Sequence, residues 1–218
     1  SQFEQAISPE GIYSQYFDLF GSPWEENAAH LPGSLLQPKF RLPIPQSHNW
    51  SYTGGPHTGW GTGLPFAAVD FAPFSDQPGC YSTEEWALAM ADGLVVRSEN
   101  GIVELDLDMD GDLRTGWVLY YLHLAANGRP EVGTFLSAGD PIGHPSCEGG
   151  TSTGTHIHIA RKYNGEWIEA AGVIPFDMEG WIPVEGEGEY DGTLVRYGDV
   201  VTACTCGNAG TLITSEVP

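Results

Sequence analysis

Residues 155–167 read THIHIARKYNGEW, and this stretch decides the fold class. Its first part, THIHI, alternates polar and branched apolar side chains, which is typical of a β-strand because successive side chains point to opposite faces. The Asn-Gly pair at 164–165 is the most typical dipeptide of a two-residue hairpin turn. The stretch therefore predicts a strand that ends in a tight hairpin, with His156 and His158 on the same face of the strand.

Similar runs recur along most of the chain. Short segments rich in aromatic and branched residues are separated by Gly, Asn and Asp, and they lie at 66–71, 94–98, 101–108, 115–125, 131–146 and 192–203. Strands at this spacing, with turns between them, predict a mainly antiparallel β-sheet. We expect a mainly β protein with one domain at 41–200, carrying a groove and long loops. An N-terminal extension or pro-region remnant would precede it at 1–40, and a C-terminal tail would follow at 201–218.

The charge of the chain argues against several classes of partner. The chain has 8 Lys and Arg against 29 Asp and Glu, a net charge of −21. Such an acidic surface argues against nucleic acid and anionic membranes as partners, since both require a cationic footprint. No apolar run approaches the roughly 20 residues that span a bilayer. The chain begins without Met or a signal peptide, which we interpret as a processed form or a trimmed piece, and we expect a secreted monomer.

The four cysteines are Cys80, Cys147, Cys204 and Cys206. None belongs to a Cys-x-x-Cys pair, so a structural zinc site made of four cysteines is not expected. An exported protein with one or two disulfides fits this pattern best. Cys204 and Cys206 either bridge each other or stay reduced.

His156 and His158 pose the main question about function. On one strand face their Cα atoms lie roughly 6.5 Å apart. The two rings could ligate one ion, could combine one ligand with a catalytic group, or could simply pack as satisfied polar residues. Spacing alone does not decide among these.

Asp70 favours a metal site. It lies inside FAAVDF at 66–71, a predicted core strand, and a buried carboxylate needs a compensating partner. No Lys or Arg is near it in sequence, whereas His57 precedes it by 13 positions across a Gly-rich loop. Two imidazoles and a carboxylate around an ion would leave an open fourth position, as in catalytic zinc sites.

Three segments together resemble the lysostaphin-type zinc metalloendopeptidases, and most closely the β-lytic and staphylolytic branch. They are GGPHTGWGTGLPFAAVDFA at 54–72, WVLYYLHLA at 117–125 and GGTSTGTHIHI at 149–159. The similarity covers roughly residues 40–176. It implies a zinc-containing groove and hydrolysis of glycine-rich peptide bonds, with peptidoglycan cross-bridges as the expected substrate.

The resemblance also implies roles for individual residues. His57, Asp70 and His158 would be the zinc ligands. His156 would be the general base that acts on the zinc-bound water, whose pKa zinc lowers to about 7. His123, expected on the strand face that also carries Tyr121 and Leu119, would help to stabilise charge in the transition state.

Other positions match the family less closely. Leu122 and Thr155 stand where the branch often has Tyr and Pro. Tyr121 and Tyr190 are candidate substrate-binding residues. Relatives bridge positions comparable to Cys80 and Cys147, so this disulfide is also expected.

A second candidate metal site lies in DLDMDGD at 106–112. The alternating carboxylates match the opening of a calcium loop, and they are Asp106, Asp108, Asp110 and Asp112. The position that should carry Glu in an EF-hand is Trp117, which excludes a true EF-hand. The alternatives are a calcium-binding turn of another kind and a solvated acidic hairpin tip.

Three functions remain open at this stage. The favoured one is the secreted zinc endopeptidase. A non-catalytic wall-binding or regulatory relative would keep the fold, but such relatives usually lose a ligand or the base. A peptidase acting on a Gly-rich protein is the third, because a net charge of −21 disfavours approach to a polyanionic wall.

Overall fold

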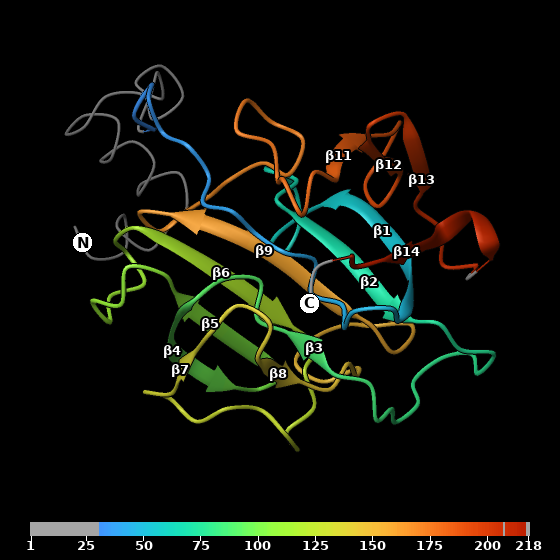
Figure 1. Ribbon diagram of the computed structural model, residues 1–218, viewed down its shortest axis with the longest axis horizontal. Helices are drawn as coiled ribbons and strands as arrows, with labels where there is room; N and C mark the ends of the chain where they lie inside the picture. Colours follow the sequence, from blue (N-terminus) through green and yellow to red (C-terminus); the bar gives the residue numbers. More distant parts are fainter. Residues whose placement is uncertain (1–30, 207, 217–218) are drawn as a thin grey trace, which may run out of the picture. The chain divides into compact units, whose positions relative to one another are not determined.

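The computed structural model describes residues 31–206 and 208–216 (Figure 1). The described residues from 36 onward belong to one compact unit. Most of the expected N-terminal extension, residues 1–30, lies outside the described residues. No helix in the described part of the chain is long and apolar enough to cross a membrane.

The described residues form fourteen strands and one short 3-10 helix. The elements are β1 (Asn49–His57), β2 (Ala68–Pro73), β3 (Ala87–Leu88), β4 (Gly93–Glu99), β5 (Ile102–Asp106), β6 (Trp117–Leu122), β7 (Phe135–Leu136), β8 (Pro141–Gly143), β9 (Ile157–Tyr163), β10 (Glu166–Trp167), β11 (Ile182–Glu185), β12 (Gly192–Arg196), β13 (Asp199–Thr202), η1 (Ala209–Thr211) and β14 (Leu212–Thr214).

One large sheet dominates the fold. Its strand order is β14-β1-β2-β9-β6-β5-β4-β7, with β10 paired to β9. All of these pairs are antiparallel, which confirms the predicted fold class. β11, β12 and β13 form a small second sheet, and β3 pairs with β8. The tail beyond residue 200 contributes β14 to the edge of the large sheet, beside β1.

The predicted Asn-Gly hairpin is present between β9 and β10. Asn164 and Gly165 have φ values of 49° and 81°, and Tyr163 pairs with Glu166. Positive φ at both central residues defines the turn whose twist matches the flanking strands. This turn fixes the end of β9, the strand that carries His158.

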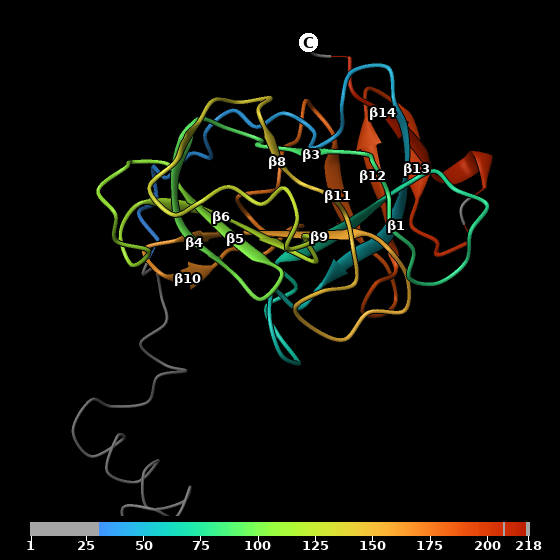
Figure 2. The same ribbon diagram turned by 90° about the horizontal axis from the view of Figure 1, so that it is seen from below.

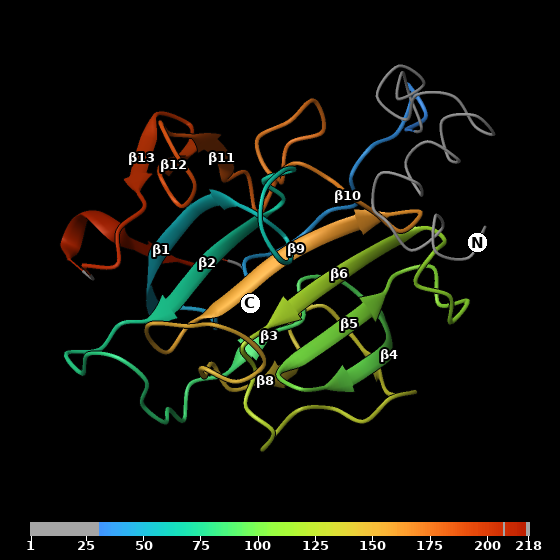
Figure 3. The ribbon, with the colours of Figure 1, turned by 180° about the vertical axis from the view of Figure 1, so that it is seen from behind.

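The two faces of the large sheet differ. One face is the apolar core, to which β2, β9 and β6 contribute Phe71, Ile159 and Tyr121. Seen edge-on, β3 and β8 lie on this side, while the β1–β2 loop and the loop before β9 project from the other side (Figure 2). Seen from behind, the β1–β2 loop lies over the sheet near β9 (Figure 3). The second face, bordered by these loops, is where the histidines gather.

Candidate active site

Strand register brings three distant side chains together on the loop-bordered face. β2 and β9 are neighbours, and Asp70 lies opposite His158. β1 flanks β2 on the other side and ends at His57, with Gly54 opposite Asp70. All three side chains are buried, at 1% exposure for His57 and 6% for Asp70 and His158.

Their atoms converge on one point. His57 Nε2 lies 2.8 Å from His158 Nδ1, and Asp70 Oδ1 lies 3.2 Å and 3.4 Å from these two nitrogens. The other ring nitrogens donate to backbone carbonyls: His57 Nδ1 to Gly55 at 2.7 Å, and His158 Nε2 to Gly59 at 3.0 Å. In neutral rings the converging nitrogens therefore carry lone pairs, so three electron-rich atoms face one another and call for a cation.

The donor set fits zinc. A tetrahedral site with bonds of 2.0–2.1 Å separates its ligand atoms by about 3.3 Å, close to the distances seen here. Asp70 Oδ1 is buried and has no hydrogen-bond donor among the described residues. A Cβ on Gly54 would come within 2.5 Å of Asp70 Oδ2, so only glycine leaves room for this carboxylate. The backbone is thus shaped around the ligand.

Electrostatics favour an ionised Asp70 between the rings. Burial alone would raise its pKa, but the positive charge that His57 and His156 can carry holds the pKa of Asp70 well below its usual value. Burial favours a neutral His57, yet Asp70 outweighs this and raises the pKa of His57. Burial lowers the pKa of His158, which Asp70 opposes only in part. An anionic carboxylate with two imidazoles is the combination that binds a divalent metal.

His156 and His123 complete the site. Their ring centroids lie 4.5 Å apart, and His156 Nε2 is 3.7 Å from Asp70 Oδ2. His156 Nδ1 lies 2.8 Å from the carbonyl oxygen of Gly154, and His123 Nδ1 lies 2.8 Å from that of Glu148. With Nδ1 donating, each neutral ring presents Nε2 as a proton acceptor.

The protonation state of His123 follows from its surroundings. Burial and, to a lesser extent, His156 lower the pKa of His123 to about 4. The ring is therefore neutral near pH 7, and its Nδ1 proton is engaged by Glu148. His123 can donate to an oxyanion from Nε2 only after it has gained a proton.

The strand faces around His123 differ from the expectation. Tyr121 and Leu119 point into the core, whereas His123 lines the groove. His123 follows the last residue of β6 with a φ of 65°, which breaks the period-2 alternation and turns its side chain to the other face. Tyr121 is fully buried, and its hydroxyl accepts the N–H of Met90. The structure thus keeps Tyr121 out of the site.

The groove has a distinctive chemical character. Its volume is about 960 Å³, and among the described residues Asp70 is the one Asp, Glu, Lys or Arg that lines it. Serine, threonine and glycine provide most of the lining outside the metal centre. Tyr190 is half-exposed, lines the groove and stacks on His57 with ring centroids 4.1 Å apart. Such a groove suits an uncharged substrate with small side chains.

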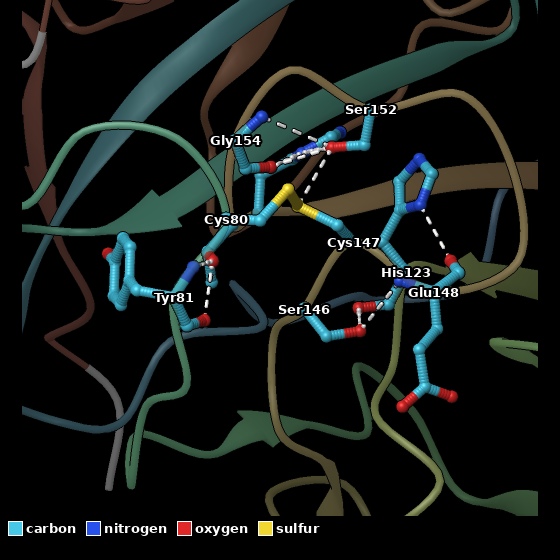
Figure 4. The surroundings of a disulfide bond; sticks show 10 residues. Cys80, Tyr81, His123, Ser146, Cys147, Glu148, Ser152 and Gly154 are labelled. Carbon is cyan, nitrogen blue, oxygen red and sulfur yellow. Dashed lines mark hydrogen bonds between the residues drawn. A yellow bond between two sulfur atoms is a disulfide. The ribbon is translucent and has the colours of Figure 1, made fainter.

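One disulfide lies beside residues that line the groove, and Figure 4 shows its surroundings. Cys80 and Cys147 are bonded, with their Cα atoms 5.9 Å apart. Thr155 stands between this bridge and His156: its Oγ1 accepts the N–H of Tyr81 and donates to the Tyr81 carbonyl. Cys204 and Cys206 also bridge each other.

The acidic tip between β5 and β6 is only partly assembled as a cation site. Oxygens of Asp106, Asp108 and Asp110 lie within 4.8 Å of one another, whereas Asp112 pairs with Arg114 at 2.7 Å. Backbone N–H groups of the loop already donate to these carboxylates. Calcium binding at this tip stays a prediction.

Several named proteins are similar to this chain in sequence. No family model matches it. The β-lytic metalloendopeptidase of Lysobacter enzymogenes is 30% identical over 176 residues, which cover 76% of this chain and 88% of that protein. The chain belongs to the lysostaphin-type (M23) metallopeptidase family.

Further comparisons place it within this M23 family. Protease LasA of Pseudomonas aeruginosa is 28% identical over 221 residues, covering 88% of this chain. The matched part of this chain spans only 48% of the length of LasA. Among solved structures, the M23 metalloprotease pseudoalterin has the same fold, with a TM-score of 0.63 at 23% identity over 77% of this chain and 96% of its own.

Sequence reasoning missed part of this M23 site. The backbone carbonyls of Gly55 and Gly59, which orient the rings, have no signature in the sequence. Ser146 and Ser152, whose hydroxyls lie beside His123 and His156, were missed for the same reason. A serine in a Gly-rich loop looks like any turn residue until the loop is folded.

Proposed function

We propose that this protein is a secreted zinc endopeptidase that hydrolyses glycine-rich peptide bonds, with peptidoglycan cross-bridges as its substrate. The observation that carries the proposal is the convergence of His57 Nε2, His158 Nδ1 and Asp70 Oδ1 beside two further imidazoles. Three ligands with catalytic bases next to them make up a hydrolytic site, since a structural zinc site would be closed by a fourth ligand.

The residues have separate tasks in this proposal. Zinc held by His57, Asp70 and His158 would act as a Lewis acid that acidifies water and polarises a carbonyl group. His156 takes the proton of the attacking water at Nε2, because its Nδ1 is bound to Gly154 and the ring is fixed in place. His123 would support negative charge on the carbonyl oxygen when it carries a proton at Nε2, and the adjacent His156, which takes a proton from the attacking water, would be the source of that proton.

The groove supports the substrate class. Among the described residues, Asp70 is the one charged side chain that lines the groove, and the metal would engage it. Ionised side chains of a stem peptide would therefore find no free opposite charge there. Burying an unpaired charge there is costly. A glycine-rich peptide needs only main-chain hydrogen bonds, which hydroxyl groups can both donate and accept. Tyr190, on the groove wall, is proposed to contact this peptide.

Secretion is proposed on the basis of the disulfides. The described chain has two, and disulfides persist in oxidising compartments outside the cytosol. The surface charge of −21 is consistent with a soluble monomer without nucleic-acid partners.

The experiment is metal analysis combined with hydrolysis of pentaglycine. We expect one zinc per chain, cleavage of the peptide, loss of cleavage in EDTA and its return when zinc is added back. Zinc at one per chain without cleavage would favour the non-catalytic wall-binding relative. A purified protein that takes up no zinc would overturn the proposal.

A further inference from the structure

His123 adopts a backbone conformation that its surroundings must impose. Its φ of 65° lies in the left-handed region, which is uncommon for any residue other than glycine. Such conformations cost on the order of 1–3 kcal/mol and persist only where neighbouring groups hold them. The side chain is 3% exposed, so the holding groups belong to the protein rather than to solvent.

Ser146 provides most of these contacts (Figure 4). The carbonyl oxygen of His123 accepts two hydrogen bonds from Ser146, one from the backbone N–H at 2.7 Å and one from Oγ at 2.9 Å. The same Oγ accepts the N–H of Glu148 at 3.0 Å. The carbonyl of Glu148 in turn holds Nδ1 of the His123 ring at 2.8 Å. One hydroxyl therefore links the backbone of His123 to the group that orients its ring.

Ser146 also contacts the second histidine. Its carbonyl oxygen accepts the N–H of His156 at 3.3 Å, and the two residues form an antiparallel bridge. The next residue, Cys147, is tied to Cys80, which fastens this turn to the neighbouring loop. Ser146 thus lies between His123 and His156 and bonds to both, although it touches neither ring.

We infer that Ser146 is a positioning residue that sets the separation and orientation of the His123 and His156 rings. This inference rests on the proposed function, in which both rings act on the reacting groups. The hydroxyl is specifically required, because it must donate to one carbonyl while it accepts from one N–H, and neither alanine nor valine can do both. Displacing a catalytic group by about 1 Å can lower a rate about 100-fold.

The test compares Ser146→Ala with Ser146→Thr. The alanine variant loses both bonds of the hydroxyl, so kcat on pentaglycine should fall by about 10- to 100-fold, while KM and the zinc content stay near wild type. The threonine variant keeps a hydroxyl and should recover kcat to within about threefold. A crystal structure of Ser146→Ala should show the two rings farther apart or rotated relative to wild type.

Thr83→Val is the matched control. Thr83 Oγ1 accepts the N–H of Glu85 two residues later at 3.1 Å, the same local bond that Ser146 makes to Glu148, but away from the groove. Its loss should lower thermal stability about as much as Ser146→Ala does and leave kcat unchanged.

The outcomes separate this inference from the proposed function. A wild-type protein that binds zinc but cleaves nothing refutes the proposed function. An active wild type with Ser146→Ala at wild-type kcat refutes the role of Ser146 alone. The inference also fails if Ser146→Thr is as slow as Ser146→Ala, or if the alanine variant loses zinc in proportion to its activity.

Discussion

At the scale of single residues, the proposed function assigns metal binding and proton transfer to different side chains. Asp70 Oδ1 faces the nitrogens of His57 and His158, and burial leaves it without any other donor among the described residues. His156 presents Nε2 to the same carboxylate from 3.7 Å, but at the oxygen that faces away from the ligand cluster. The two positions should therefore respond differently to truncation.

Asp70→Ala should lose both zinc and activity, whereas His156→Ala should keep zinc and lose activity. Removing an anionic ligand deletes a metal bond and leaves two buried imidazoles facing each other, while removing a general base slows proton transfer by about 100- to 10,000-fold. Zinc content by mass spectrometry and pentaglycine hydrolysis measure the two effects. His48→Ala, a half-exposed histidine paired with Glu85, should change neither. Equal loss of zinc in the two site variants would contradict the assigned roles.

Much of this residue-scale picture is visible in the sequence, and the missing part has a physical reason. Strand periodicity places His156 and His158 on one face, and a buried Asp70 demands a partner, but the separate roles of these residues and of His57 were implied only by the family resemblance. The orientation of His123 cannot be predicted, since a single positive φ reverses the face that periodicity assigns. Ring tautomers depend on carbonyls that only the folded loops bring close.

At the scale of elements, strands and hairpins can be predicted from local sequence, but the contacts that hold the loops in place cannot. The Asn-Gly turn at 164–165 forms as predicted because both residues accept positive φ. Tyr121 was a candidate for the groove and lies in the core, since the chain turns to the groove face only at His123, where φ is positive. The acidic tip at 106–112 forms, but Asp112 pairs with Arg114 and does not belong to the group of three carboxylates formed by the other aspartates.

The two disulfides should contribute very differently to stability. Cys80–Cys147 closes a loop of 67 residues, whereas Cys204–Cys206 spans a separation of 2. A disulfide stabilises mainly by restricting the unfolded chain, so the long loop should be worth about 2–4 kcal/mol and the short one far less. Replacing both cysteines of each pair by serine and measuring urea unfolding tests this. Equal losses of unfolding free energy for the two double variants would contradict the argument.

At the scale of the whole molecule, the fold determines the geometry of the proposed active site, whereas the net charge affects how the protein approaches its substrate. The antiparallel sheet gathers ligands from β1, β2 and β9, which are adjacent in space although His57 and His158 lie 101 residues apart. Strand order of this kind is not contained in local periodicity, so the sequence did not predict it; the family resemblance implied only which residues would be the ligands. The chain has a net charge of −21, whereas Asp70 is the one Asp, Glu, Lys or Arg among the described residues that line the groove.

Because the net charge lies outside the groove lining, the effect of salt on activity should differ between a charged wall and an uncharged peptide. A polyanionic wall and a protein of charge −21 repel each other, and the repulsion is screened once the Debye length falls to about 10 Å at 0.1 M salt. Hydrolysis of isolated peptidoglycan should therefore rise about threefold or more between 10 and 150 mM NaCl. Cleavage of soluble pentaglycine should stay nearly constant, because that peptide carries little net charge and the groove adds none beyond the metal centre. Rates on the wall that fall with added salt would instead require an attractive cationic surface, which eight Lys and Arg residues against 29 Asp and Glu cannot readily provide.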